Sequence, residues 1–259
     1  MTQALHAEWT KLRTVPTTIW LLLGAVVLSA AVSAGVAATA HVDVSGAEQQ
    51  DLVRLSLTGI DLGQVVIVVL AIIVVTEEFG TGMIGVSLTA VPRRPFLFMA
   101  KFANLALLTL VAGSATVIGC LLAGRVILPG RGLDAAHGYA VISLSHGSTL
   151  RAAFGSVVYL VLIALMSLGI AFALRDTAVS IGVVLGLLYV LPVLAQLVAD
   201  PTWHRRLLQI APFIAGLAIQ STTHPDGLPI GPWAGLGDVA IWASIALLIG
   251  GVLLCVRDA

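Results

Sequence analysis

The sequence predicts an all-α integral membrane protein with six transmembrane helices. Of its 259 residues, 59% are hydrophobic and only 10% are charged, whereas soluble domains carry about 25% charged residues. Six apolar runs each reach the roughly 20 residues that a helix needs to cross the hydrocarbon core of a bilayer. These runs are continuously apolar, without the alternation that is typical of membrane strands.

The six predicted spans form one transmembrane domain over residues 1–259. They are residues 18–38, 57–76, 102–124, 152–174, 178–198 and 237–256. Only Asp61 and Asp238 are charged residues inside these limits, and Asp238 is interpreted as the N-cap of the sixth span. Lysine and arginine are denser in the segments that lie on the same side of the membrane as the N-terminus. The positive-inside rule therefore predicts that this side is cytoplasmic and, with six spans, that both termini lie there.

Two segments outside the spans are predicted to lie at the membrane surface. Before the first span, Leu5, Trp9 and Leu12 recur at helical spacing opposite charged residues, which suits a short helix in the inner interface. The alternative is an ordinary cytosolic extension of that span. The apolar residues 207–219 are too few to cross the bilayer. We expect an outer re-entrant segment there, with a surface helix packed over the spans as the alternative.

The common sequence motifs of catalysis are missing from the chain. The dipeptide Gly-Lys never occurs, which excludes the G-x-x-x-x-G-K-S/T phosphate loop. Neither H-E-x-x-H nor G-x-S-x-G occurs, so the common metalloprotease and hydrolase signatures are also missing. We therefore predict no catalytic residue, no metal site and no cofactor on this chain. The equal numbers of basic and acidic residues, 13 of each, give no indication of nucleic-acid binding.

A few polar residues and small residues stand out inside the predicted spans. Asp61 and Gln64 lie about one helical turn apart in the second span, and Gln196 lies near the end of the fifth. Polar groups at membrane depth often line a pathway, so these three are candidate pathway-lining residues; Asp61 could equally reach the outer water. Gly182 and Gly186, four residues apart, would let two helices approach closely.

The segment TEEFGTGMIGVSLTAVPRRP, residues 76–95, interrupts the apolar pattern between the second and third spans. Glu77 and Glu78 begin it, and Arg93 and Arg94 come near its end, an order that complements a helix dipole. We predict a short cytoplasmic helix here. It would either dock onto a partner protein or serve as a solvated connector.

The chain resembles the permease subunits of type-2 ATP-binding-cassette (ABC) transporters, especially short bacterial exporter permeases with six spans. The stretches that carry the resemblance are AEWTKLRTVPTTIWLLL, TEEFGTGMIGVSLTAVPRRPFLFMAK, RLLQIAPFIAGLAI and the last span from PWAG to VRDA. The second is the most specific, because it is similar to the family's E-Y/F-x-T-G-T-I/L motif followed by P-R-R. It departs from that motif at Gly80, Met83 and Gly85.

The resemblance implies an ATP-driven exporter in the bacterial cell membrane. Two permeases, in a homodimer or a paralogous heterodimer, would form the substrate pathway within membrane lipid. Two copies of a separate cytoplasmic ATPase would bind ATP and magnesium. The connector after the second span would be the coupling helix, and its candidate ATPase-coupling residues are Glu77, Glu78, Phe79, Thr81, Gly82, Met83, Arg93 and Arg94.

Two functions of other classes remain open from the residues alone. One is an intramembrane enzyme, and the other is an immunity or scaffold protein that transports nothing. An intramembrane enzyme needs polar catalytic groups that face each other inside the spans. The predicted spans contain isolated polar residues and no histidine, which favours the permease.

Overall fold

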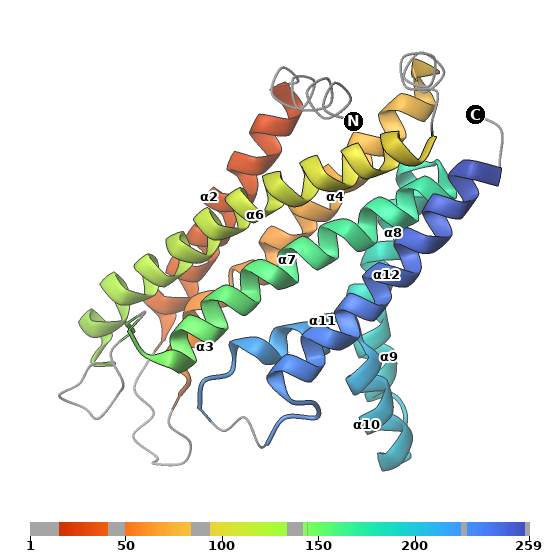
Figure 1. The fold of residues 1–259 in the computed structure, drawn as a ribbon. Coiled ribbons are helices and arrows are strands. Elements are labelled where there is room, and N and C mark those ends of the chain that lie inside the picture. The colour runs from red at the N-terminus through yellow and green to blue at the C-terminus, as the bar shows by residue number, and fades with distance from the viewer. Residues whose placement is uncertain are drawn as a thin grey trace.

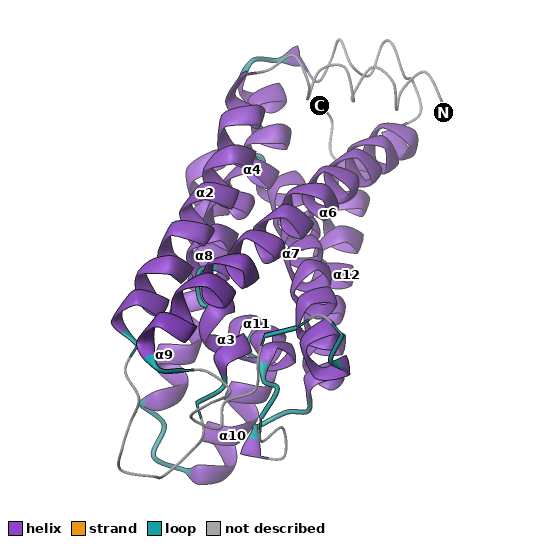
Figure 2. Ribbon diagram, turned by 90° about the vertical axis from the view of Figure 1, so that its left-hand side faces the viewer, coloured by secondary structure: helices purple, strands orange, loops and turns teal. Residues whose placement is uncertain are grey.

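The computed structural model describes residues 16–40, 50–83, 94–133, 142–143, 145–223 and 227–256. Within these ranges the regular elements are helices, joined by loops and turns, and no strand occurs (Figure 2). The predicted all-α class is therefore confirmed. The predicted interfacial helix before the first span lies outside the described residues, as do Arg93 and most of the connector, residues 84–93.

Six helices of the described chain are long and apolar enough to cross a membrane, which confirms the predicted number. They are α2 (Pro16–Thr39), α3 with α4 (Leu52–Leu57 and Ile60–Gly80), α6 with η1 (Arg94–Ile127 and Leu128–Arg131), α7 (Gly147–Leu174), α8 with η3 and α9 (Thr177–Leu185, Gly186–Val190 and Leu191–Gln196), and α12 (Pro232–Val256). Because α12 begins at Pro232, Asp238 lies inside this helix and the predicted N-cap role is wrong.

Consecutive spans run in opposite directions along the bundle (Figure 1). The start of α2, the end of α4, the start of α6 and the end of α12 consequently lie at one end of the bundle, which we call the connector end. Helix α7 occupies the centre, where it packs against α4, α6 and α12. Its large side chains Tyr159 and Phe172 are completely buried.

Helices α7 and α12 pack closely because small residues line their contact. A Cβ atom added at Gly169 of α7 would overlap the backbone of Ala246, and one added at Gly250 of α12 would overlap the backbone of Gly169. Small residues at such positions allow two helix backbones to approach in a membrane, where no hydrophobic effect drives them together. The contact fixes the position of α12 along the central helix.

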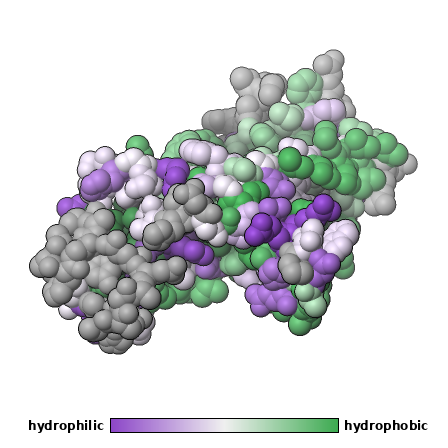
Figure 3. Space-filling model, turned by 90° about the horizontal axis from the view of Figure 1, so that it is seen from below, coloured by the Kyte–Doolittle hydropathy of each residue, from purple (hydrophilic) through white to green (hydrophobic). Residues whose placement is uncertain are grey.

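At the opposite end of the bundle, the described chain between the fifth and sixth spans forms short helices. They are α10 (Pro201–Ile210), α11 (Pro212–Leu217) and η4 (Ala218–Gln220). Helix α11 packs against α12 and α7, and a Cβ atom at Gly216 would overlap the ring of Tyr159. Figure 3 views this end of the molecule, where hydrophilic side chains gather beside apolar ones. Residues 207–219 thus form the end of α10, the helix α11, which packs against α7 and α12, and the start of η4.

Candidate functional site

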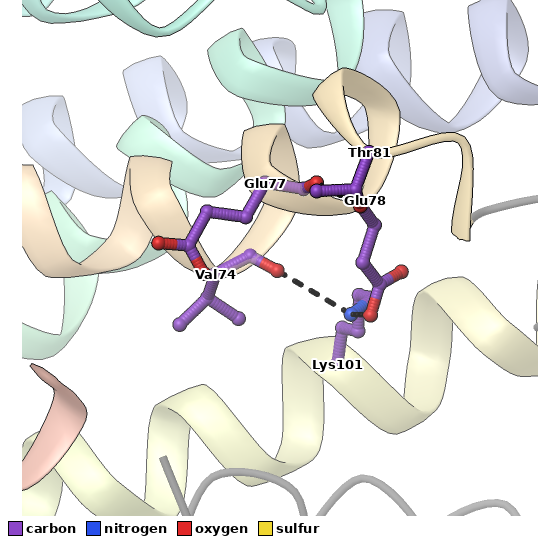
Figure 4. A network of polar contacts seen from close by, with 5 residues as sticks. All are labelled: Val74, Glu77, Glu78, Thr81 and Lys101. Atoms are coloured by element: carbon purple, nitrogen blue, oxygen red, sulfur yellow. Dashed lines mark hydrogen bonds and ion pairs between the residues drawn. The ribbon is translucent and has the colours of Figure 1, made fainter. Parts of the chain in front are cut away.

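At the connector end, a buried ion pair joins the last turn of α4 to α6. The Nζ atom of Lys101 lies 2.7 Å from Oε1 of Glu78, and the two side chains are only 1% and 2% exposed. The same Nζ atom also donates a hydrogen bond of 3.4 Å to the carbonyl oxygen of Val74 (Figure 4). Additional hydrogen bonds are what make a buried ion pair sustainable, because both ions have lost their water. The pair therefore fixes the spacing of the two helices that flank the connector.

An aromatic cluster surrounds the same helix ends. The ring of Phe172 in α7 contacts Phe98 of α6, with centroids 5.0 Å apart, and Phe79 of α4, edge-to-face at 6.3 Å. The guanidinium group of Arg175 lies 4.9 Å from the centroid of the Phe79 ring, a favourable cation–π distance. Phe79 is therefore half-buried among residues of its own chain, and α4, α6 and α7 meet at this cluster.

Arg94 ties the start of α6 to the end of α12. Its Nη1 atom donates hydrogen bonds of 3.0 Å and 3.3 Å to the carbonyl oxygens of Leu254 and Cys255. These carbonyls belong to the last turn of α12, which lacks intrahelical partners for them. Three helix ends at the connector end, those of α4, α6 and α12, are consequently linked by side-chain contacts.

The remaining candidate coupling residues of the described chain point outward. Glu77 and Thr81 are exposed, and the hydroxyl of Thr81 donates a 2.6 Å hydrogen bond to the carbonyl of Glu77. Gly82 has a φ of 70°, a left-handed conformation that suits glycine. Met83 is 48% exposed. The sequence segment thus divides into an inward set, Glu78, Phe79 and Arg94, and an outward set, Glu77, Thr81, Gly82 and Met83.

A second polar group lies inside the bundle around Gln64, which is completely buried. Its Oε1 atom accepts a hydrogen bond from the hydroxyl of Tyr159, and its Nε2 atom donates one of 2.8 Å to the hydroxyl of Tyr189. The hydroxyl of Tyr189 in turn donates to the backbone carbonyl of Asp61. The network therefore joins α4, α7 and the fifth span. Both polar atoms of the Gln64 side chain have a hydrogen-bond partner in it.

Tyr189 reaches this network from η3, a π-helical turn. Such turns are rare insertions in α-helices and occur frequently at functional sites. Pro192 follows the turn and has no backbone N–H to donate. The sequence analysis missed both tyrosines, although a tyrosine in an otherwise apolar span is a usable signal, because its buried hydroxyl needs a partner.

The three predicted pathway residues do not form one site. Gln64 belongs to the buried network, and Asp61 is half-buried beside a pocket at the far end of the bundle. Gln196, the last residue of α9, is exposed. Among the residues that the structure describes, Gln196 makes no side-chain hydrogen bond with either of the other two.

A carboxylate clasp holds the segment after η4 against the start of α3. Asp51 caps α3 by accepting a 3.0 Å hydrogen bond from the backbone N–H of Arg54. It also accepts from the hydroxyl of Thr222 at 2.7 Å, from the backbone N–H of Thr222, and from that of Thr223 at 3.0 Å. Burial raises the pKa of the Asp51 carboxyl, but these hydrogen bonds outweigh burial and hold the pKa below its ordinary value of 3.8.

The model of the family described as ABC-2 family transporter protein matches residues 4–193. The match covers more than half of the chain and includes the first four spans and the fifth as far as Val193. The connector, the Glu78–Lys101 pair and the Gln64 network all lie within it. No curated protein matches the chain significantly.

Proposed function

The chain belongs to the ABC-2 family of transporter proteins, and we propose that it is the permease subunit of an ATP-driven exporter. Its six apolar helices make it a multi-pass membrane protein. The observation that supports the proposal is the family match over residues 4–193, a range that includes the connector between α4 and α6. We infer a location in the bacterial cell membrane with both termini in the cytoplasm.

The proposed partner is a cytoplasmic ABC ATPase in two copies, which would bind ATP and magnesium and carry out the hydrolysis. The permease itself would catalyse no reaction. In this role the outward set, Glu77, Thr81, Gly82 and Met83, would contact the ATPase. Met83 supports this assignment because a half-exposed, flexible apolar side chain adapts well to a partner's groove. Arg93 would orient the connector against anionic lipid headgroups.

The inward set would transmit the motion of the ATPase to the spans. Glu78 is paired with Lys101, Phe79 packs against Phe172, and Arg94 holds the end of α12. A displacement of the connector would therefore move the ends of α4, α6 and α12 together rather than bend one helix. Coupling between distant sites requires packed elements of this kind, which shift as units.

A second permease would complete the substrate pathway, and the fifth span offers a surface for it. A Cβ atom added at Gly182 or Gly186 would meet no other atom of this chain within 4 Å. Val179, Val183 and Val190 on the same span are exposed. Many apolar side chains elsewhere also face outward, but a pair of glycines four residues apart specifically suits close contact with another helix. We propose that a second copy, or a paralogue, packs here.

Asp61, Gln64 and Gln196 would then have different roles along the pathway. Gln64 would shape the bundle from inside, because both ends of its side chain are already bonded. Asp61 would present its carboxylate to a ligand in the neighbouring pocket. Gln196 would face the outside of the fifth span near its end.

Co-expression tests the proposed function. The chain would be expressed with a candidate ABC ATPase from the same organism, purified in mild detergent and reconstituted into vesicles. We expect a complex with two copies of each subunit, and ATP-dependent movement of substrate that is lost in a Walker-motif variant of the ATPase. An isolated chain that hydrolyses ATP or another substrate would favour the enzyme, and a stable chain that never binds an ATPase would favour the scaffold.

A further inference from the structure

A pocket of about 210 Å³ opens at the end of the bundle away from the connector. It lies between the α3–α4 junction and the α11–η4 segment. Drug-sized ligands occupy pockets of about 300–1,000 Å³, so this pocket suits a smaller group. Its lining includes Arg54, Asp61, Phe213, Leu217, Gln220 and Leu228.

Two residues of this lining each have a buried polar side-chain atom that finds no hydrogen-bond partner among the described residues. One is the Nε2 atom of Gln220, whose side chain is 3% exposed, and the other is the Oδ1 atom of Asp61. Buried polar atoms are nearly always hydrogen-bonded in proteins, and exceptions call for an explanation such as a bound group. The two atoms are complementary, because an amide N–H seeks an acceptor and a carboxylate oxygen seeks a donor.

The lining of the pocket carries one side chain of each charge. Arg54 and Asp61 both line it, yet within the described chain they form no ion pair with each other. Phe213, Leu217 and Leu228 supply apolar side chains to the same lining. A guanidinium group matches phosphate and carboxylate oxygens with its planar set of donors.

We propose that this pocket binds a small zwitterionic group, with an ammonium at Asp61 and a phosphate or carboxylate at Gln220 and Arg54. The ligand's ammonium donates to the unpartnered carboxylate oxygen, and its anionic oxygens accept from the unpartnered amide. Its short linker lies against Phe213 and Leu217. A free zwitterion and the headgroup of an outer-leaflet lipid share this chemistry.

The pocket contacts the buried Gln64 network, so that binding in the pocket would affect the contacts between the spans. The backbone carbonyl of Asp61 accepts a hydrogen bond from Tyr189, and the ring of Tyr189 lies 5.2 Å from that of Phe213. Two lining residues of the pocket therefore contact the π-helical turn of the fifth span. The assignment of the ligand as transported cargo rests on the exporter role proposed above, whereas binding itself can be measured without ATPase or transport.

The test measures binding to the full chain in phosphatidylcholine nanodiscs by titration calorimetry. Phosphoethanolamine serves as the phosphate zwitterion and glycylglycine as the carboxylate zwitterion. Ethanolamine, inorganic phosphate and acetate serve as the separate cationic and anionic halves. We expect a zwitterion to bind at least about tenfold more tightly than either half. A parallel arm purifies the chain from membranes containing phosphatidylethanolamine and measures retained lipid by native mass spectrometry, which identifies a headgroup as the source.

Three substitutions decide whether binding occurs in this pocket. Asp61→Asn and Gln220→Leu should each weaken zwitterion binding, or lipid retention, by about tenfold or more, while Asp200→Asn should leave it unchanged. Asp200 is a matched control because it is an exposed N-cap of α10 and asparagine also caps helices. Gln220→Leu keeps the proposal testable if Asp61→Asn fails to fold. Wild-type protein that binds neither zwitterion and retains no such lipid, or variants that bind as wild type does, would overturn the proposal.

Discussion

Glu78 and Lys101 form an ion pair of 2.7 Å that is almost wholly removed from solvent. They come from the two helices that leave and re-enter the bundle on either side of the connector. A hinge at this point would require the end of α4 and the start of α6 to move relative to each other, and the ion pair restrains that motion. The connector is therefore attached to a rigid base, which is the arrangement that a coupling element needs.

Breaking the pair from one side should destabilise the protein severely. Lys101→Met removes the ammonium group that lies 2.7 Å from the buried Glu78 carboxylate, and single deletions from a buried ion pair cost about 3–5 kcal/mol. We expect a sharply lower yield of folded chain and a lower thermal unfolding midpoint in detergent. Replacing both partners, with Glu78→Gln and Lys101→Met, should restore most of the stability because no buried charge remains. A Lys101→Met protein as stable as wild type would show that the pair is dispensable.

The Gln64 network should behave as one cooperative unit. Gln64→Leu removes the hydrogen-bond partner of the Tyr159 hydroxyl, and an orphaned buried hydroxyl costs about 1–3 kcal/mol. Tyr159→Phe removes that hydroxyl, so adding it to Gln64→Leu should cost less than the two single effects combined. Thermal unfolding of the two single variants and the double variant measures this difference. Strictly additive effects would mean that Gln64 and Tyr159 are not coupled.

The glycines of the fifth span test the proposed permease dimer. Gly182→Leu combined with Gly186→Leu should leave the chain folded, because open space adjoins both positions, but should lower the dimer fraction by about tenfold or more. Gly24→Leu combined with Gly35→Leu is the matched control on α2, where open space also adjoins both positions. Mass photometry in nanodiscs measures the dimer fraction. Dimers that survive the first pair and dissociate with the second would place the contact on α2 instead.

The Asp51 clasp predicts a response to acid. Because the folded pKa is lowered below 3.8, the stabilisation is fully present above the unfolded pKa and is lost as the pH falls through the folded pKa. Opening of the clasp is thus expected only below about pH 4. At neutral pH, Asp51→Ala should accelerate hydrogen exchange at the amides of Thr222 and Thr223 by about tenfold, since hydrogen bonds to charged groups contribute about 1.5–3 kcal/mol. Unchanged exchange at both amides would contradict the clasp.

Much of this fold could be predicted from the sequence because lipid imposes a simple rule. Each span must satisfy its own backbone hydrogen bonds and cover them with apolar side chains, so six apolar runs gave six helices. The helix ends were harder to predict, since α6 begins at Arg94 and α12 at Pro232, well outside the apolar runs. Helices continue past the hydrocarbon core, and hydropathy does not mark where they stop.

The polar contacts could not be predicted, because they join residues far apart in the sequence. Lys101 and Glu78 are 23 positions apart in the sequence, and only the packing of α6 against α4 reveals that they are partners. Gln64 was singled out as a pathway residue, but Tyr159, 95 positions away, holds one end of its side chain. Sequence patterns identify polar residues that need partners, whereas the helix arrangement decides which partners they find.

The most direct test of the account concerns Met83, the exposed apolar residue of the outward set. A carboxylate at this position would be buried without a partner in an ATPase contact but would remain solvated in a free connector. Met83→Asp and the control Trp203→Asp, which introduces the same group at an exposed site on α10, are compared with wild type at matched membrane abundance. The account predicts that Met83→Asp loses at least about 90% of the co-purified ATPase and of transport, a tenfold effect or about 1.4 kcal/mol, while Trp203→Asp keeps both. Full ATPase retention and normal transport by Met83→Asp would contradict it.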